Sequence, residues 1–187
     1  MKLAFDDKDS VTYVIDTSGL IKLEVTFNYG NPVFSAIWEE IEELIDQGRF
    51  RTIDFVEDEI NRYRGEKDFL KRWTKKWKQK LIFQTDAETF TAAIPIINTE
   101  YNTGFFDAKK LASGQEEADP YLIAYCKVNN YTLITDENKH KPNKIPGVSA
   151  KNDVKCIDIF EFLAERELKM ERKKKLFPKL DKGSQYD

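Results

Sequence analysis

Apolar and polar residues are grouped along the chain in blocks that predict strands alternating with helices. The run Val11-Thr12-Tyr13-Val14-Ile15 is rich in β-branched and aromatic residues and stops at the polar run Asp16-Thr17-Ser18, a pattern typical of a buried strand. From Asn31-Pro32 to Gly48, apolar residues recur three and four positions apart and predict a helix. A short strand over 50–55 and a helix over 56–64 are expected next.

The second half of the chain continues this alternation. Its expected elements are helices over 86–101 and 119–128, strands over 131–135 and 154–157, and a last helix from about residue 159. Pro95 is expected to kink or divide the first of these helices. Because parallel neighbours need crossover connections, strands separated by helices predict an α/β fold whose central, mostly parallel sheet is flanked by helices.

The length and composition indicate one globular domain. The 187 residues are 41% hydrophobic, which is enough apolar material for a core. We expect a single domain over 1–165, with a basic helical insertion over 62–85. A basic helix end and tail are expected over 166–187.

Charge is segregated along the chain although its total is small. The 30 basic and 33 acidic residues give a net charge of -3, which alone argues against a strongly anionic partner. Acidic residues gather within 39–59, whereas basic residues gather within 62–80 and 166–182. The near-neutral total therefore does not exclude a nucleic-acid partner.

Scarce histidine and cysteine exclude several kinds of chemistry. With His140 as the single histidine, one chain cannot supply two imidazoles as acid and base. Cys126 and Cys156 are too far apart for a zinc-ribbon or redox pair, and we expect two small buried thiols in a reducing compartment. The N-terminus turns acidic before a signal-peptide core, and no apolar stretch is long enough to cross a bilayer. We therefore expect a soluble, cytoplasmic protein with no membrane partner.

Carboxylates follow two of the expected strands. Asp16 comes directly after the first strand, and Asp136-Glu137 come directly after the strand over 131–135. Asp119 and Glu59 lie near the starts of two expected helices. Each acid alone is explained as a helix cap or a solvated side chain, but ligands of such folds bind at the carboxyl edge of the sheet. Together they predict an acidic cluster at that edge.

Such a cluster needs a cation. Two carboxylates about 5 Å apart repel by roughly 3 kcal/mol at an effective dielectric of about 20, so four would protonate or lose structure without one. Oxygen-only ligands favour Mg²⁺ or Mn²⁺ over zinc. Such ions activate water and bind phosphodiester oxygens without any histidine.

Four segments carrying these acids resemble the PIN domain ribonucleases in order and spacing. They are Val14-Ile15-Asp16-Thr17-Ser18, Val56-Glu57-Asp58-Glu59-Ile60, Ala118-Asp119-Pro120-Tyr121-Leu122-Ile123-Ala124 and Leu133-Ile134-Thr135-Asp136-Glu137. The third is similar to a bacterial branch whose motif reads ADP, an aromatic residue, then LIAYA. The resemblance implies a Rossmann-like, three-layer fold.

The resemblance also implies roles for single residues. Asp16, Glu59 and Asp119 match the family's first three acids. The fourth acid is Glu137 or Asp136, since the family writes this motif as Thr, any residue, Asp. Asp16, Asp119 and Glu137 are then the expected metal ligands.

Three hydroxyl side chains match polar positions of the family that orient the first carboxylate or metal-bound water. They are Thr17, Ser18 and Thr135, which we group with the substrate-binding residues. Capping of the following helix or turn is their alternative role.

The function implied by the resemblance is Mg²⁺- or Mn²⁺-dependent hydrolysis of RNA. Many PIN proteins of this size are toxins of bacterial toxin–antitoxin pairs, neutralised by a small antitoxin protein, and many are homodimers. An antitoxin and a second copy are therefore expected partners beside RNA.

The basic stretch after Glu59 is an expected RNA-binding surface. Lys71, Arg72 and Lys75 are expected to contact phosphates, and Trp73 or Trp77 to stack on unpaired bases. The alternative is that both indoles face the core and the lysines keep the helix soluble.

Two other functions remain open. One is a non-catalytic PIN-like module that binds RNA or protein, suggested by the irregular fourth acid. The other is a phosphatase-type hydrolase with a strand-end Asp nucleophile, but its motif reads Asp, any residue, Asp, and Ser18 stands at the second acid.

Overall fold

A five-stranded parallel sheet forms the centre of the protein in the computed structural model, which describes residues 10–63, 65 and 68–168. Its strands lie in the order β3-β2-β1-β4-β5. They are β1 (Tyr13–Ile15), β2 (Phe50–Ile53), β3 (Ile82–Phe83), β4 (Thr132–Ile134) and β5 (Cys156–Ile157). All four pairs of neighbouring strands in this sheet are parallel, so the predicted α/β fold with a parallel sheet is confirmed.

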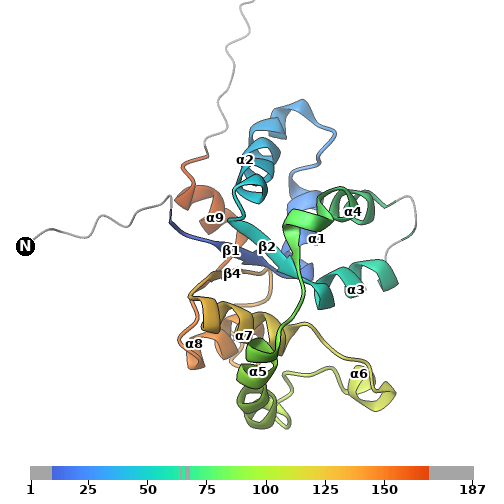
Figure 1. Cartoon of the computed structure of the whole chain (residues 1–187), viewed down its shortest axis with the longest axis vertical. Helices are drawn as coiled ribbons and strands as arrows, with labels where there is room; N and C mark the ends of the chain where they lie inside the picture. Colours follow the sequence, from blue (N-terminus) through green and yellow to red (C-terminus); the bar gives the residue numbers. More distant parts are fainter. Residues whose placement is uncertain (1–9, 64, 66–67, 169–187) are drawn as a thin grey trace, which may run out of the picture.

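Helices cover both faces of this sheet (Figure 1). They are α1 (Thr17–Thr26), the short 3-10 helix η1 (Pro32–Phe34), α2 (Ser35–Asp46), α3 (Asp54–Tyr63), α4 (Phe69–Leu81), α5 (Ala87–Glu100), α6 (Ala108–Ser113), α7 (Asp119–Asn129), α8 (Ile145–Lys151) and α9 (Ile159–Glu165). In Figure 1, α1, α2, α4 and α9 lie above the sheet and α5, α7 and α8 lie below it. The three predicted layers are therefore present.

The central strand positions the first acid. Tyr13 of β1 is level with Phe50 of β2 and with Thr132 of β4. The backbone N–H of Asp16 donates to the carbonyl of Ile134 at 3.0 Å. Asp16 therefore stands at the carboxyl edge of the sheet, beside the end of β4.

Several elements differ from those expected. The pattern does not predict α1, α6, α8 or β3, and the helix expected over 31–48 is divided into η1 and α2. The strand expected over 50–55 ends at Ile53, because Asp54 begins α3. Pro95 does not divide α5, which buries Ala93 and Ile96 on either side of it. Packing of these turns maintains the helix through the proline.

The two tryptophans of α4 face the protein. Trp73 is 2% exposed, and the Nε1 atoms of Trp73 and Trp77 both donate to Oε1 of Glu42 at 3.1 Å. Trp38 of α2 lies edge-on to Trp73, with ring centroids 5.4 Å apart. Trp73 is therefore not available to stack on a base, and the alternative of core-facing indoles is the correct one for this residue.

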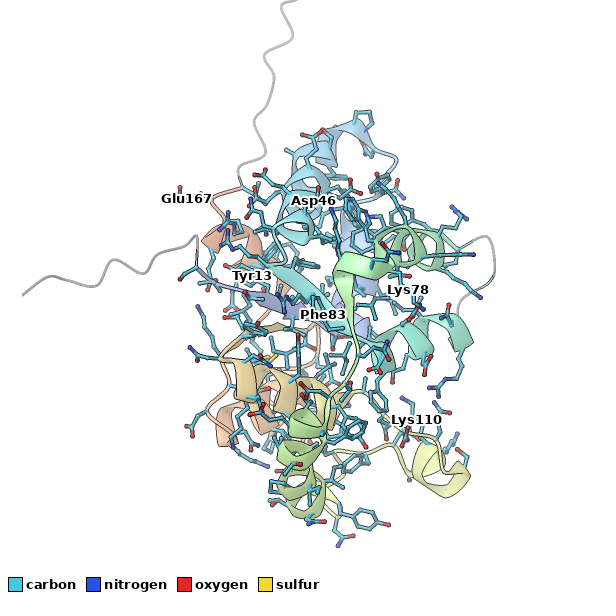
Figure 2. The ribbon with its side chains drawn as sticks, in the orientation of Figure 1. Tyr13, Asp46, Lys78, Phe83, Lys110 and Glu167 are labelled. Carbon is cyan, nitrogen blue, oxygen red and sulfur yellow. The ribbon has the colours of Figure 1, made fainter. Side chains whose placement is uncertain are left out.

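The lysines of α4 are partly used in ion pairs. Lys76 pairs with Glu42 at 3.3 Å, Lys78 with Glu57 at 2.8 Å, and Lys80 with Asp46 at 2.7 Å. Figure 2 shows Lys78 beside the ribbon of α4, at the surface of the molecule. These pairs link α4 to α2 and α3.

The predicted domain division stays a prediction. The tail expected over 166–187 lies mostly outside the described residues, as does the basic run at 172–175. Within the described part, α4 packs on β2 and β3.

No helix of the described part is long and apolar enough to span a membrane. Both cysteines are free thiols, and Cys126 is buried as expected, whereas Cys156 is only partly buried.

Replacing Gly147 by alanine is expected to lower the free energy of unfolding by about 1–3 kcal/mol, the cost of overpacking a close contact. A Cβ atom at Gly147 in α8 would lie 2.6 Å from Cα of Pro142 and 2.7 Å from the carbonyl oxygens of Lys141 and Pro142. Urea unfolding measures the loss. Gly65→Ala is the matched control, since nothing lies within 4 Å of its Cβ position. Equal stability of the two variants would contradict the close approach.

Candidate active site

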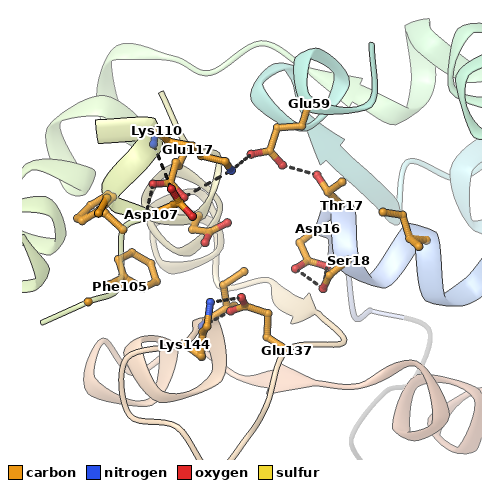
Figure 3. Close-up of a pocket in the computed structure, with 16 residues that line it drawn as sticks. Asp16, Thr17, Ser18, Glu59, Phe105, Asp107, Lys110, Glu117, Glu137 and Lys144 are labelled. Atoms are coloured by element: carbon orange, nitrogen blue, oxygen red, sulfur yellow. Dashed lines mark hydrogen bonds and ion pairs between the residues drawn. The ribbon is translucent and has the colours of Figure 1, made fainter. Parts of the chain in front are cut away.

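A cavity of about 510 Å³ opens at the carboxyl edge of the sheet (Figure 3). Six carboxylates and two lysines line it: Asp16, Glu59, Asp107, Glu117, Asp119, Glu137, Lys110 and Lys144. They come from the residue after β1, from α3, from the segment between α5 and α7, from the start of α7, and from the segment between β4 and α8. Four of the five predicted acids therefore share one cavity.

Asp16 is fixed by a network of hydrogen bonds. Its carboxylate, 3% exposed, caps α1 by accepting from the N–H of Gly19 at 2.6 Å. The hydroxyls of Ser18 and Thr135 donate to Oδ2 at 2.8 and 2.6 Å. Burial raises the pKa of Asp16 to about 7, although these donors act in the opposite direction. Asp16 therefore caps α1 and also lines the cavity, with its carboxylate fixed by these hydrogen bonds.

Asp119 is surrounded by like charges. It is the first residue of α7, and the preceding Ala118 takes the cap position, so Asp119 does not itself cap the helix as considered above. No hydrogen bond or ion pair reaches its carboxylate from the described residues. Burial raises its pKa well above the ordinary value, and the charges of Glu137 and Asp16 raise it further.

Glu59 faces the cavity from α3. Its Oε2 accepts from the Thr17 hydroxyl at 2.6 Å, and its Oε1 lies 3.4 Å from Nζ of Lys110 (Figure 3). The side chain is buried. Thr17 therefore orients the second acid, whereas Ser18 and Thr135 orient the first.

The fourth predicted acid in the cavity is Glu137, from the segment between β4 and α8. Its two oxygens accept from Nζ of Lys144 at 2.9 Å and from the N–H of Ile145 at 2.7 Å. This contact raises the pKa of Lys144. Asp136 is exposed, pairs with Lys22 at 3.5 Å and does not line the cavity. Of the two acids after β4, Glu137 therefore lines the cavity and Asp136 does not.

Four charged residues of the cavity escaped the sequence analysis: Asp107, Glu117, Lys110 and Lys144. Glu117 stands two residues before Asp119, in the run Glu116-Glu117-Ala118-Asp119, and this local density of acids was the available signal. No periodicity marks the lysines. Conversely, the expected phosphate-binding residues Lys71, Arg72 and Lys75 lie on α4 and are not among the cavity-lining residues.

The donor set suits a hard divalent cation. Its possible ligand atoms are carboxylate oxygens, and among the described residues Asp119 forms no hydrogen bond or ion pair, although the charges of Lys110 and Lys144 act on it. No three acids, imidazoles or thiols of the described part are close enough together to form a full ligand group. Mg²⁺ keeps several waters and is commonly bound through one or two carboxylates. Asp16 and Asp119 are the residues that would hold such an ion, whereas both oxygens of Glu137, the third ligand expected from the sequence, already accept from Lys144 and from the N–H of Ile145.

These features define a parallel α/β protein with a carboxylate site at the carboxyl edge of its sheet. The chain belongs to the family described as Domain of unknown function (DUF4411), which matches residues 13–170. No curated protein matches the sequence.

Three solved structures are similar to this chain at low sequence identity. One chain of DNA-bound VapBC from Salmonella typhimurium is 14% identical, with a TM-score of 0.50 over 79% of this chain and 98% of that one. PAE2754 from Pyrobaculum aerophilum is 12% identical (TM-score 0.46, 90% and 97% covered). FitAB bound to an IR36 DNA fragment is 14% identical (TM-score 0.44, 79% and 94% covered). The first likeness agrees with the α/β fold implied by the PIN-domain resemblance.

Proposed function

We propose that this protein is a divalent-metal-dependent endoribonuclease of the PIN type, which hydrolyses RNA phosphodiesters. The observation that carries the proposal is the Asp119 carboxylate, which forms no hydrogen bond or ion pair among the described residues and is acted on by the charges of four other acids: Asp16, Glu59, Glu117 and Glu137. Such a charge arrangement is costly unless a cation enters. The parallel α/β fold and the PIN-like order of the acidic motifs support a nuclease over other metal-binding functions.

In this proposal each of the cavity residues named above has a distinct role. Asp16 and Asp119 hold Mg²⁺ or Mn²⁺. Thr135 and Ser18 hold the Asp16 carboxylate by hydrogen bonds, and Glu59, oriented by Thr17, would accept a proton from the attacking water. When bound, the ion supplies an activated water and neutralises charge on the phosphate oxygens.

The proposal predicts RNA cleavage by the purified protein with Mg²⁺ or Mn²⁺, which stops when EDTA is added. Gel analysis of a labelled single-stranded RNA measures it. Asp16→Asn, prepared in parallel, is expected to be inactive because it removes the charge of one of the two carboxylates proposed to bind the metal ion. Cleavage that persists both in EDTA and in this variant would belong to a contaminant and would contradict the proposal.

A small protein partner is a further part of this proposal. The similar solved structures include VapBC and FitAB, and by this likeness we propose a toxin role, with an antitoxin that covers the acidic cavity. Homodimerisation and the finer likeness to the ADP-aromatic-LIAYA branch stay predictions.

One observation favours a second candidate, a non-catalytic binding module. Glu59, Glu117 and Glu137 all engage lysines, which reduces the need for a metal. Calorimetric titration with Mn²⁺ distinguishes the two functions. A nuclease is expected to bind Mn²⁺ and to lose the site in Asp119→Asn, whereas a binding module need show no such site.

A further inference from the structure

Lys110 lines the acidic cavity and lies on the short helix α6, which the sequence pattern did not predict. The segment 101–118, which we name the connecting segment, joins α5 to α7 and contains α6. In Figure 3, Lys110 reaches from this segment toward Glu59. Its side chain is 27% exposed.

Two carboxylates of the connecting segment fix the position of Lys110. Oδ1 of Asp107 accepts from the backbone N–H groups of Lys109 and Lys110 at 2.8 and 3.1 Å, and so caps the start of α6. Oε1 of Glu117 accepts from the N–H of Asp107 at 2.8 Å. The backbone at the start of α6, which carries the lysine, is therefore held by both carboxylates.

The ammonium of Lys110 is shared rather than tightly paired. Its Nζ lies 3.4 Å from Oε1 of Glu59 and 3.5 Å from Oε2 of Glu117. Lys144, by contrast, holds Glu137 at 2.9 Å. An ammonium carries three donors, so Lys110 has capacity for a further acceptor.

Both carboxylates would remain hydrogen-bonded if Lys110 moved to another anion. Glu59 also accepts from the Thr17 hydroxyl at 2.6 Å, and Glu117 also accepts from the N–H of Asp107 at 2.8 Å. Releasing the lysine therefore leaves neither acid without a donor. Such an arrangement suits a cation that exchanges partners better than one that only anchors a helix.

We infer that Lys110 binds a phosphate of single-stranded RNA in the cavity, with Asp107 and Glu117 as its positioning residues. The inference rests on the proposed function, since it assigns the substrate contact of the same site. It replaces the α4 surface of Lys71, Arg72 and Lys75 as the first place where the phosphate is held.

Binding of a fluorescent single-stranded RNA tests the inference by anisotropy, in the Asp16→Asn background with Mg²⁺ present so that cleavage does not interfere. Lys110→Gln is expected to weaken binding about tenfold and to reduce the slope of log affinity against log salt by about 0.7, the value for one phosphate contact on a single strand. Lys110→Arg is expected to retain most of the affinity. Lys109→Gln removes the same charge from the same helix, outside the cavity lining, and is expected to change binding less than twofold.

The outcomes separate this inference from the nuclease proposal. Unchanged binding in Lys110→Gln, equal losses in Lys110→Gln and Lys109→Gln, or no RNA binding by the parent would overturn the role of Lys110. Thermal unfolding of each variant identifies a loss that comes from misfolding, and in that case retained affinity in Lys110→Arg still supports the role. Lys110-dependent binding without metal-dependent cleavage by the parent protein would instead overturn the nuclease.

Discussion

Asp119→Asn is expected to reduce the rate of RNA cleavage by about a hundredfold to a thousandfold, the loss typical when one preorganised electrostatic group leaves an active site. Asn keeps the size of the side chain but removes the charge that has no partner among the described residues. Initial rates at saturating Mn²⁺ measure the effect. The defect is expected in kcat as well as in kcat/KM, because the charge acts on the reacting groups and not only on substrate binding.

Glu116→Gln is the matched control for this variant. Glu116 is exposed, lies three residues before Asp119 and does not line the cavity, so the same change of charge is expected to alter the rate less than twofold. Asp119→Asn is also expected to unfold at a higher denaturant concentration than the parent in EDTA, since it relieves the repulsion from Glu137 and Asp16. A variant that loses both activity and stability would indicate misfolding, and unchanged activity would remove Asp119 from the site.

The sequence predicts the parts of this site that follow strand ends. Asp16 and Glu137 were found because each follows a short, apolar strand, and a parallel sheet brings such ends to one edge. The choice between Asp136 and Glu137 required the side-chain directions, which depend on Lys144 and the start of α8. Side-chain direction at a strand end alternates from residue to residue, so a one-residue difference decides which acid enters the cavity.

The rest of the site depends on tertiary contacts that leave no periodic signal. The residues of α8 read as a loop because Pro146 and Gly147 are poor helix formers, and close packing on the preceding loop is not visible in composition. The six-residue α6 is too short to show helical periodicity, and Lys110 was therefore missed. The role expected for Trp73 was wrong for a related reason: the pattern shows an amphipathic helix but not which partner its apolar face meets.

The stability of the metal-free protein is expected to depend on pH through Asp16. The pKa of this buried carboxyl is about 7 in the folded protein against an ordinary value of 3.8. The folded state therefore holds the proton more tightly than the unfolded state, and the stability that the neutral carboxyl contributes is full below about pH 4. It is lost as the pH rises from about 4 to about 7, with a total of about 4 kcal/mol.

Comparison of the parent with Asp16→Asn isolates this effect from the other titrating groups. In EDTA, the gain in unfolding free energy on replacing Asp16 is expected to increase by about 4 kcal/mol between pH 4 and pH 8, and then to level off. Urea unfolding at a series of pH values measures it.

Asp86→Asn is the control of opposite sign, because the hydrogen bond from the N–H of Thr89 lowers the pKa of Asp86. No gain in unfolding free energy with rising pH is therefore expected for this variant. Saturating Mn²⁺ is expected to abolish the gain at pH 8, since the ion stabilises only the protein that retains the carboxylate. A gain that is independent of pH would show that burial does not raise the pKa of the Asp16 carboxyl. A gain that persists in Mn²⁺ would show that Asp16 is not part of a metal site.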